Sequence, residues 1–84
     1  MDPVDMIWYV WEAHCMEINM MNDYGMVTTG VMVEMNAITS ETQAQGQFTM
    51  SLRKRACDLV NSLNVDDLKL AYKLRNEDYE RLGA

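Results

Sequence analysis

The chain has 84 residues, which leaves room for one domain near the lower size limit for folding on a hydrophobic core alone. Apolar residues make up 49% of it and charged residues 24%, a composition that excludes a disordered chain. The two cysteines form no CxxC pair, and the longest apolar run, residues 6–11, is far shorter than the ~20 residues of a membrane span. We therefore expect one cytoplasmic domain of residues 1–84, without a targeting peptide or a membrane contact.

The net charge of −6 is unevenly distributed. Residues 1–52 contain seven acidic residues and no Lys or Arg, whereas residues 53–84 contain all seven basic residues and six acidic ones. An acidic first half repels nucleic acid and attracts basic surfaces. The expected partner is therefore another protein, one with a basic surface, and nucleic acid is disfavoured.

The first predicted helix has clear start and stop signals. Asp2 can cap it, Pro3 suits the first helical position, and Asp5 favours the positive end of the helix. Turn residues 22–25 end it. Its apolar residues recur in steps of four and three, which places them on one face: Val4, Trp8, Trp11, Cys15 and Ile18.

Two further stretches repeat this spacing. The second follows a cap at Thr28 or Thr29, and an alternative interpretation makes residues 26–33 a strand with a turn at Thr29-Gly30. The second stretch contains Val31, Met35, Ile38 and Thr42. The third contains Leu52, Ala56, Leu59 and Leu63, with Phe48 and Val60 beside them.

The second and third stretches share one phase, because Gln45 and Thr49 continue the steps of three and four. Residues 30–63 could therefore form one coiled-coil-like helix of ~50 Å, which would need a partner helix. Alternatively, Gly46 breaks the chain into two helices. We favour the break, because residues 39–47 are too polar for a core.

The fourth helix begins at a capping Asn64, with Asp66 and Asp67 in its first turn, and ends at Gly83. Its predicted inner face contains Leu68, Tyr72, Arg75, Tyr79 and Leu82. The expected fold is all-α, a small helical bundle of three to four helices.

Residues that could support catalysis or metal binding are sparse. The one histidine, His14, has only Glu17 at helical spacing, which predicts a histidine bonded to a neighbouring acid. Cys15 is predicted to pack as a small hydrophobe, and Cys57 has no partner histidine. Phosphate-binding loops and paired zinc spacings are absent from the sequence. We expect no enzyme activity, no metal and no cofactor.

Methionine and tryptophan are concentrated in the first half. Flexible methionines fill cores or form adaptable binding surfaces, and copper binding is disfavoured because few His and Cys residues accompany them. Trp8 and Trp11 share the seam of the first helix, whereas Tyr9 points elsewhere. Six of the nine methionines lie between residues 16 and 35: Met16, Met20, Met21, Met26, Met32 and Met35.

These features predict a non-enzymatic protein-binding factor that inhibits or regulates a larger host protein. Small acidic proteins of viral or phage origin act in this way, and the acidic half would cover a nucleic-acid-binding groove of the host protein. The residues predicted to bind the partner are Trp8, Trp11, Glu12, Glu17, Met20, Met21 and Asp23.

Two alternatives remain open. The first is a self-assembling subunit, a coiled-coil oligomer built on the long seam. The second is a helical DNA-binding regulator that uses the basic patch Arg53, Lys54 and Arg55. That patch could equally be a solvated face, or it could pair with acids of the first half across a subunit contact.

Overall fold

The computed structural model describes the backbone of residues 3–83 and the side chains of residues 6–83. This part of the chain forms four helices and no strand: α1 (Pro3–Asp23), α2 (Thr29–Gln45), α3 (Met50–Asn61) and α4 (Val65–Gly83). The predicted all-α fold is confirmed, and the alternative strand in residues 26–33 is wrong because α2 begins at Thr29. The predicted cap Asp2 and the side chains of Val4 and Asp5 lie outside the described residues.

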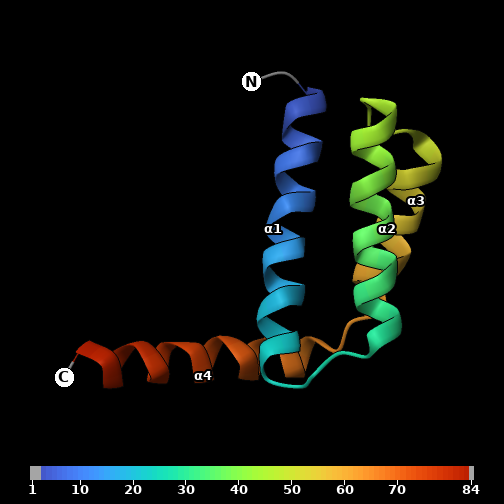
Figure 1. Ribbon diagram of the computed structural model, residues 1–84. Helices are drawn as coiled ribbons and strands as arrows, with labels where there is room; N and C mark the ends of the chain where they lie inside the picture. The colour runs from blue at the N-terminus through green and yellow to red at the C-terminus, as the bar shows by residue number, and fades with distance from the viewer. Residues whose placement is uncertain (1–2, 84) are drawn as a thin grey trace.

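Helices α1, α2 and α3 form a three-helix bundle in which α2 contacts both α1 and α3. The chain direction alternates, so that α1 and α3 run the same way and α2 runs back between their ends (Figure 1). Helix α4 does not complete the bundle. It crosses the C-terminal end of α1 and runs away from α2 and α3 (Figure 1), and Ala71 is its one buried residue. The side of the bundle between α1 and α3 is therefore left uncovered by α4.

None of the four helices in residues 3–83 combines the length and the apolar character needed to cross a bilayer.

Signals that are local in the sequence fix the helix ends. Helix α1 ends before Gly25, whose φ of 69° lies in the left-handed region that favours glycine. Helix α2 begins after Thr28, whose Oγ1 accepts a hydrogen bond from the N–H of Val31 at 3.3 Å. Helix α4 begins after Asn64, whose Oδ1 accepts from the N–H of Asp66 at 2.9 Å. The predicted caps Thr28 and Asn64 are confirmed.

The chain breaks at Gly46, so the alternative of one long helix over residues 30–63 is wrong. Gly46 has a φ of 71°, and its N–H donates to the carbonyl of Thr42 at 2.9 Å, which closes the last turn of α2. A new cap follows at once, since Thr49 Oγ1 accepts from the N–H of Leu52 at 3.3 Å. The unbroken heptad phase reflects two helices that pack on the same core.

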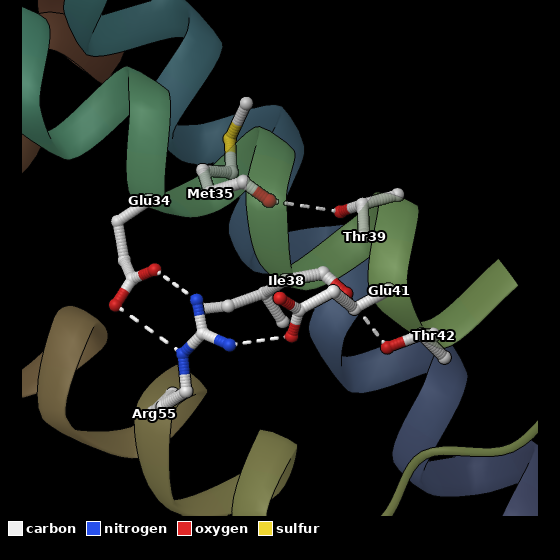
Figure 2. A network of polar contacts seen from close by, with 7 residues as sticks. All are labelled: Glu34, Met35, Ile38, Thr39, Glu41, Thr42 and Arg55. Atoms are coloured by element: carbon white, nitrogen blue, oxygen red, sulfur yellow. Dashed lines mark hydrogen bonds and ion pairs between the residues drawn. The ribbon is translucent and has the colours of Figure 1, made fainter. Parts of the chain in front are cut away.

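The main core lies between α1, α2 and α3 and confirms the predicted seams of these helices. Thr42 is buried within α2, and its hydroxyl donates to the carbonyl of Ile38 at 2.8 Å (Figure 2). The indole N–H of Trp11 donates to Thr39 Oγ1 at 3.1 Å, which joins α1 to α2. The buried residues of this core are Trp11, Ile18, Met35, Ile38, Phe48, Leu52, Ala56 and Leu59.

A second, smaller cluster forms where α4 crosses α1. It contains the buried residues Met20, Met21 and Ala71. The inner face predicted for α4 is wrong for its last turns, because Tyr79 and Leu82 are 58% and 85% exposed, whereas Leu68 packs in this cluster. The side-chain bonds between α4 and the end of α1 extend to Asp78, which accepts from Tyr24, and leave the last turn of α4 uncovered, whereas the prediction assumed a helix packed along its whole length.

Candidate protein-docking surface

Three of the residues predicted to bind a partner belong to the core instead. Trp11, Met20 and Met21 are 2%, 3% and 1% exposed. Trp11 fills the main core, and the two methionines fill the cluster under α4. Burial removes Met20 and Met21 from the docking surface described below, because both pack in the cluster under α4, whereas Trp11 still forms part of the lining of that surface.

The other four predicted residues remain at the surface to different degrees. Trp8 is half-buried, and its ring packs edge-on against Phe48 with the ring centroids 6.3 Å apart. Glu12 and Asp23 are exposed. Glu17 is partly covered and already bonded within the chain. The acidic part of the predicted surface is therefore carried by Glu12 and Asp23.

Helix α1 exposes a second apolar stripe, on the side away from α2. Met6, Tyr9 and Val10 are between 53% and 58% exposed, and Met16 is 64% exposed. With Ala13, these side chains follow the helical steps of three and four, as the core-facing stripe does. Sequence reasoning assigned Tyr9 correctly to another face but did not recognise that this face is apolar. The spacing of the apolar residues from Met6 to Met16 would have predicted this apolar face.

The exposed side of α1 continues into a groove between α1 and α3. Its volume is about 420 Å³. The groove exists because α1 and α3 both pack against α2, while α4 turns away from this side (Figure 1). Its apolar lining consists of Met6, Ile7, Val10, Trp11, Phe48, Ala56 and Val60. Four polar side chains also line it, namely His14, Arg53, Cys57 and Asn61.

Arg53 is the cation of this groove. Its Nε donates to the carbonyl of Phe48 at 2.9 Å, and its Nη1 lies 3.9 Å from Met50 Sδ. Among the described residues no carboxylate forms an ion pair with Arg53. Among the side chains of residues 6–83, Arg53 thus places a positive charge without an acidic partner beside an apolar groove.

The rest of the predicted basic patch is paired within the chain. Lys54 Nζ lies 3.1 Å from Asp58 Oδ2. Arg55 donates to both carboxylate oxygens of Glu34 and to Glu41, with its shortest contact to each at 2.5 Å (Figure 2). These contacts join α2 to α3 and raise the pKa of Arg55, first through the hydrogen bond to Glu34. The proposed pairing with acids of the first half therefore occurs inside one chain.

Polar contacts also join α4 to α1. The hydroxyl of Tyr72 donates to Glu17 Oε2 at 2.8 Å, and His14 Nδ1 lies 3.1 Å from Glu17 Oε1, as the sequence predicted. The hydroxyl of Tyr24 donates to Asp78 at 2.5 Å. No group of three metal-ligating side chains occurs in the part of the chain that the structure describes.

The two cysteines lie in different surroundings. Cys15 is half-buried against the main core, and burial raises the pKa of its thiol. This is the packing role that the sequence predicted. Cys57 is exposed and lines the groove, as does His14, but no hydrogen bond joins the two within residues 3–83.

Comparison with known proteins gives no match to a family model, to a curated protein or to a solved structure. The function is therefore argued from the groove, its polar edge and the exposed side of α1.

Proposed function

We propose that this chain is a non-enzymatic protein-binding factor and that the groove between α1 and α3 is its docking surface. The observation that carries the proposal is a groove of about 420 Å³ with a mainly apolar lining that includes the exposed side chains of Met6 and Val10. Contiguous exposed apolar surface of this kind marks interaction sites in small proteins. Covering it would contribute about 25 cal/mol for each Å² of apolar area removed from water.

The shape of the groove favours a helical segment of the partner. Two helices that run the same way form its sides (Figure 1), and a third helix laid between them would complete a four-helix cross-section. Such a segment anchors itself through apolar residues spaced three and four apart. Exposed Glu12 and Asp23 on α1 would steer a partner with a basic surface. In this proposal the chain inhibits or regulates a larger protein by covering that segment.

A matched pair of substitutions tests the proposal. Val10 lines the groove and is 56% exposed, whereas Val33 lies on α2 outside the groove and is 62% exposed. Val10→Glu places a carboxylate where the partner's apolar side chains would be buried, which costs binding free energy. We expect crosslinked capture from the producing cell, quantified by mass spectrometry, to recover a specific protein with the native chain and with Val33→Glu. Recovery with Val10→Glu should fall at least tenfold.

Because both valines are largely exposed, neither substitution should unfold the bundle, and circular dichroism checks this. If the two variants recover the same proteins in the same amounts as the native chain, the groove is not the docking surface and the proposal fails.

A further inference from the structure

The second half of α4 projects from the molecule with apolar side chains in solvent. The helix continues past the end of α1 to Gly83 (Figure 1), and all of residues 76–83 except Asp78 are exposed. Two of them still have contacts within the chain, because Asp78 accepts a hydrogen bond from Tyr24 and the hydroxyl of Tyr79 accepts from Arg75. Tyr79 and Leu82, one turn apart, are 58% and 85% exposed. We name residues 76–83 the arm. A helical segment this short gains little stability by itself and depends on packing to persist.

The arm carries negative charge, whereas the groove carries the positive charge of Arg53. Glu77 and Glu80 are exposed, and neither forms an ion pair among the described residues. Arg53, the cation of the groove, is likewise without an acidic partner there. These groups cannot meet within one chain, because the arm runs away from α3, on the far side of α1 (Figure 1).

Resting on the proposed use of this groove, we propose that in the free protein its occupant is the arm of a second copy of the chain, which the larger partner would displace. Tyr79 and Leu82 of one copy would enter the apolar lining of the other, and the arm's carboxylates would approach Arg53. Helix α4 of one copy would then act as the fourth helix in the bundle of the other copy. Each copy offers one arm and one groove, so a reciprocal dimer satisfies both.

Sedimentation velocity and light scattering over a concentration series test this proposal. The mass should rise from the 9.7 kDa of one chain toward twice that value. Leu82→Glu should weaken association at least tenfold, and Val33→Glu should leave it unchanged. A native chain that stays monomeric at millimolar concentration overturns the proposal, as does unchanged association of Leu82→Glu.

A charge exchange tests the contact with Arg53 separately. Arg53→Glu and the pair Glu77→Lys with Glu80→Lys should each weaken association at least tenfold, and all three changes together should restore it to within about threefold. Asn36→Lys with Gln43→Lys adds positive charge at exposed positions of α2 outside both surfaces and should have no comparable effect. If Arg53→Glu unfolds the bundle, the Leu82→Glu result decides, because Leu82 is largely exposed.

The outcome separates this inference from the proposed function. If the chain is monomeric but Val10→Glu still abolishes capture of the partner, the inference is wrong and the proposed function stands. If Val10→Glu changes neither dimer formation nor the capture of the partner, the inference and the proposed function are both wrong.

Discussion

At the scale of single residues, two tyrosine hydroxyls attach α4 to α1. Tyr24 donates to Asp78, and Tyr72 donates to Glu17. Each hydrogen bond requires the neutral hydroxyl, and it raises the pKa of both tyrosines above the ordinary value of about 10. These contacts matter because α4 has only one buried side chain to hold it in place.

We expect the tyrosines to make stability fall at alkaline pH. Their pKa is higher in the folded chain than in the unfolded chain, so the folded chain retains the protons longer. The resulting stabilisation is fully present below about pH 10 and is lost as the pH rises through the folded pKa. Urea unfolding between pH 8 and 12 should show a smaller alkaline loss for Tyr24→Phe with Tyr72→Phe. An alkaline slope equal to that of the native chain would show that these contacts are not formed in solution.

Residue type alone could not identify the docking side chains. Tryptophan and methionine are common both in cores and at interfaces, so composition could not separate Trp11 and Met20 from a binding surface. Their burial depends on α2 and α4, which pack against α1 from distant parts of the sequence. The pairing of His14 with Glu17 was predictable because both lie on one helical turn.

At the scale of elements, two glycines play opposite roles in α2. Gly46 ends the helix in the left-handed conformation, and a Cβ added there would contact nothing within 4 Å. Gly30 lies inside the first turn with ordinary helical backbone, where an added Cβ would meet Thr28 Oγ1 at 3.6 Å. Substitution at Gly46 therefore tests backbone strain, and substitution at Gly30 tests helix propensity.

We expect alanine to have opposite effects at these positions. Gly46→Ala should lower the free energy of unfolding by about 1–2 kcal/mol, the cost of a left-handed residue that carries a Cβ. Gly30→Ala should raise it by about 0.5–1 kcal/mol, because alanine loses less conformational freedom in a helix. Thermal or chemical unfolding followed by circular dichroism measures both. Equal effects of the same sign would contradict the assigned helix boundary at Gly46.

Helix ends were predictable from the sequence, whereas helix placement was not. Thr28 and Asn64 bond to N–H groups two or three residues away, so a short window of sequence contains the whole signal. The face that α4 buries depends on where it crosses α1. The pattern from Leu68 to Leu82 is helical throughout but carries no information about that crossing.

At the scale of the whole molecule, the uneven charge has a structural use. Arg55 of the second half binds Glu34 and Glu41 of the first half and joins α3 to α2 (Figure 2). The uneven charge of the sequence predicted such pairing across a subunit contact, but the structure forms the pairing within one chain. Arg53, two residues earlier and on the side of the groove, forms no ion pair among the described residues and would offer its charge to a partner.

The uncovered groove follows from the arrangement of all four helices. Three helices bury enough apolar surface to form a core, and the fourth leaves the bundle with apolar residues of its own exposed. Both surfaces remain because no segment within residues 3–83 covers them. We therefore expect a protein to cover the groove in the cell.

Cys57 allows that coverage to be measured directly, because it lines the groove and is exposed. Maleimide labelling of Cys57 in the producing cell, quantified by mass spectrometry, can be normalised to Cys15, which is half-buried elsewhere. The account predicts that this ratio is several-fold lower in the cell than for dilute purified protein, and that Val10→Glu removes the difference while Val33→Glu keeps it. Equal ratios in the cell and in dilute solution would contradict it.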